Sequence, residues 1–433
     1  LYYYKIYKMT QFFKVLGGVI LVLFLGGIIY YFAKNEALPK GKAGKDADAL
    51  AIKMINALNS DAFKNTEVIE WSFRDVHHYK WYKQESIVHV SWDNKKVVLD
   101  TKSPEKSTVF IDNKKTKNSE LITQAKGFFN NDSFWLVAPY KVFDKGTERR
   151  LVKHQGKEAL LITYTSGGST PGDSYLWILD NNYLPKSYKM WTSILPIGGV
   201  SATWQPLKTT ESGIKLPTNH KLSLFGLEIP ITNVKAYNAK ANELANKVLK
   251  AIKHKAYKNT RYIEWSFVGK RSFKWDKEKH IVDVSWDSIR VHLFPEKKEK
   301  SSVYFNDKLQ KTADSTIVKK AWDIFNNDSF WLVAPHKLFD NGVIRTLEQV
   351  NDKTALRVTY TSGGTTPGDS YIWILADNYV PKSYKIYLKN KRMNGTSATW
   401  EDWITTESGA LLPTNHTFGN GRKLSMGEVK GYN

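Results

Sequence analysis

The chain has 433 residues, of which 42% are hydrophobic, 13% aromatic and 24% charged, a balance that is typical of globular domains and excludes a disordered or low-complexity chain. Its formal net charge of +22 is compatible with nucleic acid, an anionic membrane surface or a lysine-rich solvated exterior. The basic residues do not gather into one arm and the N-terminus predicts export, so we expect a solvated exterior, with phospholipid headgroups as the first specific partner to consider and no nucleic acid.

The first predicted element is a membrane anchor. Residues 15–33, VLGGVILVLFLGGIIYYFA, carry no charge and are long enough to cross a hydrocarbon core of about 30 Å as a helix. Lys5, Lys8 and Lys14 precede this stretch, which predicts a cytoplasmic N-terminus over residues 1–14. A cleaved signal peptide is the alternative, but its apolar region would be shorter and would end in a small-x-small site.

Residues 34–45, KNEALPKGKAGK, follow the anchor and predict a short flexible linker. The chain has no Cys, which excludes disulfides, thiolate metal sites and the lipidated cysteine of a lipoprotein. An exported eukaryotic protein of this size would usually carry disulfides. We therefore expect a bacterial inner-membrane protein with a single span and the bulk of the chain in the periplasm.

Beyond the linker every feature occurs twice. FNNDSFWLVAP at residues 129–139 recurs at 325–335, and TYTSGGSTPGDSYLWIL at 163–179 recurs with two changes at 359–375. The spacing of 196 residues far exceeds the roughly 20 to 50 residues of solenoid or propeller repeats. The sequence therefore predicts two homologous domains in tandem, over residues 46–238 and 239–433.

Each predicted domain follows the same α+β order. A helix opens the first domain, with Leu50, Met54 and Leu58 on one face. Alternating strands follow, such as the one with Val88, Val90 and Trp92 on one side. A second helix begins near residue 119, where Ser119 is the expected cap, and strands resume up to residue 238. This order favours a curved antiparallel sheet with its helices covering one face.

A short strand–turn–strand segment resembles a known family. Trp177 and Asp180 are followed by Leu184-Pro185, and Trp373 and Asp377 are followed by Val380-Pro381. With the order of elements, this is similar to the half-barrel of the bacterial lipoprotein carriers LolA and LolB. The resemblance implies an incomplete barrel whose open side is covered by helices, and a lipid or lipoprotein acyl chain as ligand. Those carriers are single domains, soluble or lipid-anchored, whereas this chain is a tandem on a protein anchor.

Residues retained in both repeats are the candidate ligand contacts, at a cavity or its rim. They are mostly tryptophans, which could line an acyl-chain cavity, act as platforms for sugars, or fill the core. The candidates are Trp71, Trp92, Trp135, Trp177, Trp204 and Asp173 in the first repeat, and Trp265, Trp286, Trp331, Trp373, Trp400 and Asp369 in the second. The two aspartates belong to a glycine-rich segment, residues 166–173 and 362–369. We expect this segment to form a turn, with a rim contact to a ligand as the alternative.

No motif predicts catalysis, a metal site or a cofactor. Of the histidines, only His220 and His416 recur, and we interpret them as structural. The hypothesis is a membrane-anchored periplasmic binding protein for an apolar ligand: a lipid, an acyl chain or a lipoprotein. A non-catalytic structural subunit of a cell-envelope complex and a glycan-binding module are the alternatives, and no protein partner is indicated.

Overall fold

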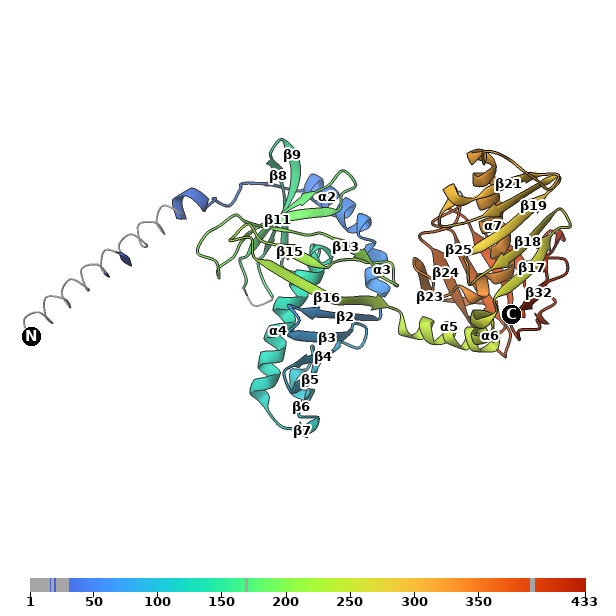
Figure 1. Cartoon of the computed structure of the whole chain (residues 1–433). Helices are drawn as coiled ribbons and strands as arrows, with labels where there is room; N and C mark the ends of the chain where they lie inside the picture. The colour runs from blue at the N-terminus through green and yellow to red at the C-terminus, as the bar shows by residue number, and fades with distance from the viewer. Residues whose placement is uncertain (1–15, 17–18, 21–30, 168–169, 390–393) are drawn as a thin grey trace, which may run out of the picture. The chain divides into compact units, whose positions relative to one another are not determined.

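The computed structural model describes residue 16 and residues 19–20, 31–167, 170–389 and 394–433. The chain divides into two compact units, residues 1–236 and 237–433, here called the N-terminal and C-terminal units (Figure 1). The predicted anchor, residues 15–33, falls mostly outside the described residues. Within the described part of the chain, no helix has both the length and the apolar character needed to span a bilayer.

From residue 35 onwards, the described part of the N-terminal unit combines three helices with two large sheets. The helices are α2 (Lys45–Ala57), α3 (Ser60–Asn65) and α4 (Ser119–Val137), and the 3-10 turns are η1 (Pro104–Lys106) and η2 (Ala138–Lys141). The strands are β1 (Lys42–Ala43), β2 (Val68–Phe73), β3 (His77–Tyr82), β4 (Ile87–Trp92), β5 (Lys95–Asp100), β6 (Thr108–Ile111), β7 (Lys114–Thr116), β8 (Thr147–His154), β9 (Lys157–Tyr164), β10 (Ser174–Leu179), β11 (Pro185–Trp191), β12 (Val200–Thr203), β13 (Leu207–Thr209), β14 (Lys215–Pro217), β15 (Asn219–Lys221) and β16 (Glu228–Tyr237).

One sheet has the order β1–β8–β9–β10–β11–β12 and the other the order β15–β16–β2–β3–β4–β5–β6–β7, with β13–β14 as a separate pair. A single bridge from Ala202 to Leu222 links the two large sheets. Helix α4 packs against β5, β6 and β14, and α2 packs against β8 and β9 (Figure 1). The expected α+β class, with open curved sheets and a few helices, is confirmed.

The strands form where the sequence alternates. In β4, Val88, Val90 and Trp92 are buried and the residues between them are partly exposed. Burying a side chain of this size stabilises the fold by about 1.5–3 kcal/mol, which fixes the face that each strand turns inward. The cap of α4 is Asn118, whose side chain accepts a hydrogen bond from the Leu121 N–H. The helix therefore has its cap one residue before the expected Ser119.

The segment after the predicted anchor is bound to the N-terminal unit, whereas a flexible linker was expected over residues 34–45. The Glu36 carboxylate accepts from the Lys189 ammonium at 2.6 Å, and the Glu36 carbonyl accepts from the Trp191 indole N–H at 2.7 Å. Residues 42–43 then pair with β8. These contacts tie the segment to β11 and to the edge of β8.

The C-terminal unit has a similar order of helices and strands, but without a counterpart of β1 and with two short strands in the place of β16. Its helices are α5 (Ala239–Ala251), α6 (His254–Asn259) and α7 (Ser315–Val333), with η3 (Lys298–Lys300) and η4 (Ala334–His336). Its strands are β17 (Tyr262–Phe267), β18 (Arg271–Asp276), β19 (Ile281–Trp286), β20 (Ile289–Leu293), β21 (Ser302–Phe305), β22 (Lys308–Leu309), β23 (Val343–Val350), β24 (Lys353–Tyr360), β25 (Ser370–Leu375), β26 (Pro381–Tyr387), β27 (Thr396–Thr399), β28 (Ile404–Thr405), β29 (Leu411–Leu412), β30 (Asn415–Thr417), β31 (Lys423–Ser425) and β32 (Lys430–Tyr432). The sheets run β22–β21–β20–β19–β18–β17–β32 and β23–β24–β25–β26–β27, with the pairs β28–β29 and β30–β31.

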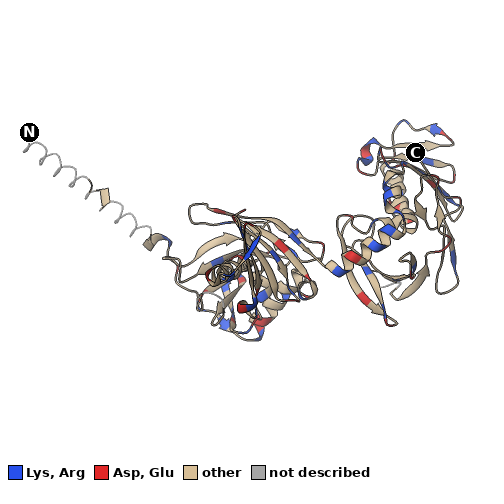
Figure 2. Cartoon of the chain, turned by 90° about the horizontal axis from the view of Figure 1, so that it is seen from below, with Lys and Arg blue, Asp and Glu red and all other residues tan. Residues whose placement is uncertain are grey.

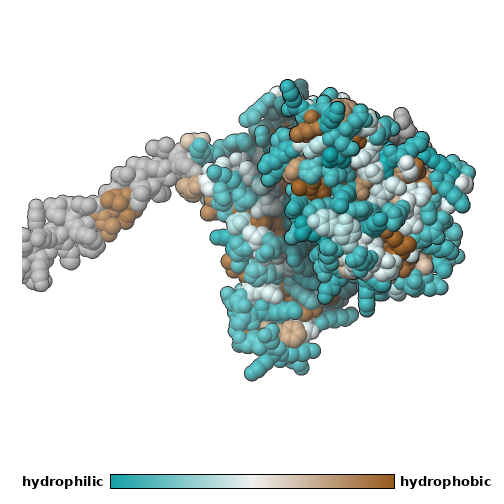
Figure 3. Space-filling model, turned by 45° about the vertical axis from the view of Figure 1, so that its right-hand side comes forward, coloured by the Kyte–Doolittle hydropathy of each residue, from teal (hydrophilic) through white to brown (hydrophobic). Residues whose placement is uncertain are grey.

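Charge is spread over the surface of each unit. Segments with Lys or Arg and segments with Asp or Glu are interspersed over both units (Figure 2). The face seen in Figure 3 is mainly hydrophilic, with hydrophobic residues scattered over it. Both views agree with the solvated exterior expected from the composition.

Candidate ligand-binding site

Most of the candidate tryptophans lie in the two cores. Eight of the ten expose at most 6% of their surface: Trp71, Trp92, Trp177, Trp204, Trp265, Trp286, Trp373 and Trp400. The Trp71 ring stacks on Tyr79 at 4.4 Å, and the Trp265 ring stacks on Phe273 at the same distance. Rings packed in this way fill the space between sheet and helix, so in this structure they offer no face to a ligand.

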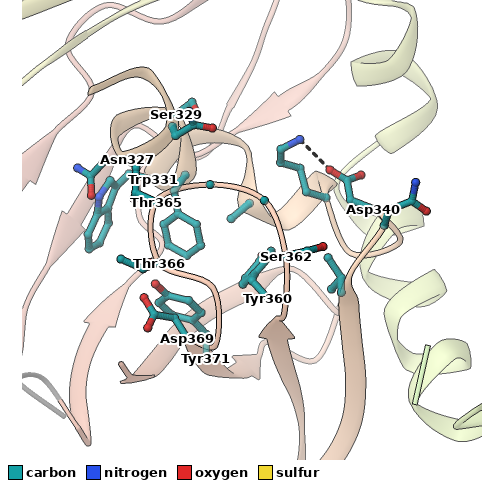
Figure 4. A pocket seen from close by; sticks show the side chains of 18 residues that line it. Asn327, Ser329, Trp331, Asp340, Tyr360, Ser362, Thr365, Thr366, Asp369 and Tyr371 are labelled. Atoms are coloured by element: carbon teal, nitrogen blue, oxygen red, sulfur yellow. Dashed lines mark hydrogen bonds and ion pairs between the residues drawn. The ribbon is translucent and has the colours of Figure 1, made fainter. Parts of the chain in front are cut away.

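The C-terminal unit has a pocket of about 270 Å³ where three segments meet: the end of α7 with η4, the start of β23, and the loop between β24 and β25. Two of the candidate residues, Trp331 and Asp369, line it. In Figure 4 the loop of residues 361–369 arches over the pocket, with Trp331 and Asn327 on one side and Tyr360 on the other.

Aromatic rings form the inner wall of this pocket. The Phe330 ring on α7 lies 4.6 Å from the Tyr371 ring on β25 and 5.9 Å from the Tyr360 ring at the end of β24. The two tyrosine rings are 5.9 Å apart, edge to face. Such ring pairs contribute about 0.5–1.5 kcal/mol beyond the area they bury. The wall is therefore mainly apolar, and contacts between rings from three elements, α7, β24 and β25, hold it in place.

The loop over the pocket depends on one close approach. The Gly342 carbonyl accepts hydrogen bonds from both the backbone N–H and the hydroxyl of Thr361. A Cβ on Gly342 would lie 1.9 Å from the Ser362 hydroxyl, and its φ of +80° is also unfavourable for other residues. The two loop ends come close at β25 too, where Gly368 N–H donates to the Tyr360 carbonyl. The sequence around Gly342 and Ser362 thus fixes where the loop begins.

Polar groups surround the mouth of the pocket. Asp369 is buried, and its carboxylate accepts from the Lys389 N–H at 2.8 Å, which anchors the end of the loop. The Lys337 ammonium pairs with the Asp340 carboxylate at 2.8 Å on the opposite side. An apolar wall below a polar rim suits a ligand that has both characters.

The Tyr360 hydroxyl is buried and has no hydrogen-bond partner among the described residues. Burial, followed by the nearby Tyr371 and Asp340, raises the pKa of Tyr360 well above its ordinary value. Burial and Asp369 also raise the pKa of Tyr371. Both hydroxyls therefore keep their protons at neutral pH and can donate hydrogen bonds.

The N-terminal unit places the corresponding residues in the same arrangement. The Phe134 ring lies 4.6 Å from the Tyr175 ring, and a Cβ on Gly146 would lie 1.9 Å from the Ser166 hydroxyl. Asp173 is buried and accepts from the Ser193 N–H at 2.9 Å. Trp135, on α4, is partly buried and packs against Tyr188 and His220. Residues 168–169 of this loop lie outside the described residues.

The sequence did not identify Phe330, Tyr360 and Tyr371 as site residues, although each lies inside a repeated segment. The candidate tryptophans follow from their recurrence in both repeats, but recurrence extends over whole segments and does not single out the residues of a pocket. The pocket combines Trp331 with smaller rings beside the glycine-rich loop. His220 and His416 are buried, and the His220 ring bonds the carbonyls of Thr203 and Trp135 at 2.7 Å. Among the described residues, no group of three His, Asp or Glu side chains could hold a metal ion.

Two solved structures are similar to part of the chain. One is a DUF1329 family protein from Desulfovibrio piger, with 11% identity, a TM-score of 0.28, and coverage of 44% of this chain and 92% of that one. The other is a putative outer membrane lipoprotein-sorting protein domain from Vibrio parahaemolyticus, with 8% identity, a TM-score of 0.22, and coverage of 43% and 93%. No family model and no curated protein matches the chain. At these identities and scores, neither likeness assigns a family or a function.

Proposed function

We propose that the chain is a non-catalytic binding protein whose C-terminal pocket takes the apolar end of an amphiphilic molecule, such as the acyl chain of a lipid or lipoprotein. The observation that carries the proposal is the glycine-rich loop closing over a wall of Phe330, Tyr360 and Tyr371. An apolar cavity under a rim of hydroxyls, amides and charges suits a ligand with a tail and a polar head.

Binding would work by partition. Each methylene that leaves water for the aromatic wall contributes about 0.8 kcal/mol. A volume of about 270 Å³ lies near the lower limit of typical ligand pockets, roughly 300 Å³. The pocket therefore takes the end of a chain and leaves the head group at the rim, near Lys337 and Asp340.

A titration tests this function. Dansyl-undecanoic acid is added to the delipidated full-length chain, and dansyl fluorescence reports binding. Thr365→Trp places a large ring at the mouth of the pocket and should weaken binding at least tenfold. Thr312→Trp makes the same change at an exposed position outside the pocket lining and should leave binding unchanged. Equal affinities in both variants, or no binding by the parent chain, would contradict the proposal.

The buried tryptophans favour a second candidate, a structural subunit of a cell-envelope complex whose sheets are filled by their own side chains. Eight candidate tryptophans expose at most 6% of their surface, as expected for side chains that fill the core of a scaffold. The titration separates the two candidates. If the chain is a scaffold, the affinity for dansyl-undecanoic acid should not differ between Thr365→Trp and Thr312→Trp.

We further propose the bacterial inner membrane as the location, with residues 15–33 as a single span and the rest of the chain in the periplasm. The support is the uncharged stretch and the three lysines before it. Protease protection of right-side-out membrane vesicles tests this topology.

We also propose that residues 46–238 and 239–433 arose by duplication of one domain, supported by the repeated segments at a spacing of 196 residues.

A further inference from the structure

Each unit carries an exposed tyrosine in an unfavourable backbone conformation. Tyr183 follows β10 with φ of +63°, and Tyr379 follows β25 with φ of +66°. In both, the tyrosine N–H bonds the carbonyl three residues earlier, and the register shifts by one residue at the end of the preceding strand. This is a hairpin loop with a bulge whose left-handed position is normally occupied by glycine.

Local structure does not explain these tyrosines. Both side chains are 40% exposed, so neither ring is held by the core. The side chains that support the loop differ between the units: the Asp180 carboxylate accepts from the N–H groups of Asn182 and Leu184, whereas Ala376 occupies that position in the C-terminal unit. Both units have a tyrosine at a position that favours glycine, although the side chains that stabilise the loop differ between them. We therefore attribute the tyrosine to a function of its ring and not to the needs of the loop.

The two rings lie at equivalent grooves. The groove beside Tyr183 has a volume of about 680 Å³ and that beside Tyr379 about 270 Å³. Each groove is lined by the first helix of its unit, by the hairpin β8–β9 or β23–β24, and by the loop that carries the tyrosine. A lysine of that helix lies over one face of each ring: Lys53 Nζ is 4.9 Å from the Tyr183 centroid, and Lys247 Nζ is 5.5 Å from the Tyr379 centroid.

The chemistry of the grooves points to an uncharged, hydroxyl-rich ligand. The lining of the first groove balances Lys157 and Lys186 against Glu158 and Asp180. In the second, the lining lysine, Lys353, pairs with Asp377 at 3.8 Å. Balanced charges disfavour a ligand that is simply anionic, whereas they provide both donors and acceptors for hydroxyl groups. The aromatic face supplies the apolar contact that the C–H face of a sugar ring needs.

We propose that these two grooves bind an uncharged saccharide, with Tyr183 and Tyr379 as the stacking platforms and the lysines and carboxylates of each groove bonding its hydroxyls. This site is separate from the C-terminal pocket, whose lining shares no residue with either groove. A sugar and an amphiphile would therefore not compete for the same residues.

Replacing the tyrosines by glycine gives a sharp test because glycine suits the backbone. The full-length chain is applied to an array of uncharged oligosaccharides, and the strongest binder is titrated by calorimetry. The variant carrying both Tyr183→Gly and Tyr379→Gly should keep or raise the melting temperature while losing at least tenfold in affinity. Tyr183→Phe with Tyr379→Phe, which keeps both rings, should retain binding within about threefold.

Three results would overturn the proposal: no binding on the array, unchanged affinity in the glycine variant, or a fall in melting temperature that matches the loss of binding. The last would assign the tyrosines a structural role. Vesicles of phosphatidylglycerol serve as the comparison, and tyrosine-dependent binding to these vesicles without saccharide binding would show an anionic lipid surface to be the ligand instead. Dansyl-undecanoic acid binding should be unchanged in all these variants.

Discussion

At the scale of single residues, the pocket depends on a glycine at position 342. Gly342 has φ of +80°, and any Cβ there would meet the Ser362 hydroxyl at 1.9 Å. Gly363 has a similar φ of +76°, but nothing lies within 4 Å of its Cβ direction. The two glycines therefore separate the cost of backbone strain from the cost of the clash.

We expect Gly342→Ala to destabilise the C-terminal unit by about 2–4 kcal/mol, of which about 1–2 kcal/mol is backbone strain and the rest overpacking. Gly363→Ala should cost only the strain, about 1–2 kcal/mol. Urea denaturation measures both free energies of unfolding. Adding Ser362→Ala should recover part of the loss in the first variant and none in the second, and equal costs for both glycines would contradict the role of the clash.

Tyr360→Phe removes a buried hydroxyl that has no partner among the described residues. We expect the free energy of unfolding to stay the same or rise by up to about 1 kcal/mol, because the folded state no longer buries an unsatisfied polar group. The comparison is with the parent chain in the same denaturation experiment. A loss of more than about 1 kcal/mol would mean that the hydroxyl is bonded in solution.

At the scale of elements, the two units differ at the turn that follows their long helix. In the N-terminal unit the Tyr140 hydroxyl donates to the Leu58 carbonyl, and its ring stacks on Phe63 at 4.2 Å. The C-terminal unit has His336 there, stacked on Tyr257 at 4.1 Å. Burial lowers the pKa of His336 to about 3, because charging the ring in this environment is unfavourable.

The lowered pKa of His336 predicts that the free energy of unfolding depends on pH. Neutral His336 is favoured in the folded state, so its contribution to stability is complete above the unfolded pKa of 6.5 and is lost as the pH falls towards 3. Each pH unit below 6.5 costs about 1.4 kcal/mol, or about 2 kcal/mol at pH 5. His336→Tyr, the residue of the other unit, should remove this loss. Denaturation of both proteins at pH 7.5 and pH 5 measures the difference, and parallel pH profiles would contradict it.

The elements themselves were largely predictable, and the pocket was not. Period-two alternation at Val88, Val90 and Trp92 determines a strand and its buried face, because these are local properties of the chain. The cap differed by one residue, since Asn118 and Ser119 are both capable of capping. The pocket instead depends on the approach of Gly342 to Ser362, between segments separated in sequence, and no local pattern reveals such a contact.

At the scale of the whole molecule, the chain forms two compact units, and each has a core of its own. We expect calorimetry to resolve two unfolding transitions, because each unit has its own hydrophobic core. Gly342→Ala should lower one transition by several degrees and leave the other in place. A single transition that moves as a whole would show that the units unfold together.

At this scale, recurrence in both repeats did not by itself distinguish ligand contacts from core residues. The retained tryptophans could line a cavity or fill the core, and eight of the ten lie in the core, where a curved sheet with a helix against it needs large rings. Trp331 and Asp369 do line the pocket, since Trp331 lies beside the glycine-rich loop and Asp369 ends it. Their neighbours Phe330, Tyr360 and Tyr371 complete it.

The central claim is that an acyl chain enters the pocket of the C-terminal unit. Photolabelling with a diazirine-bearing fatty acid, followed by mass spectrometry of the digested full-length chain, tests it most directly. The account predicts labels concentrated between residues 326 and 371, reduced by Thr365→Trp and unaffected by Thr312→Trp. Labels spread over both units, or absent from this segment, would contradict it.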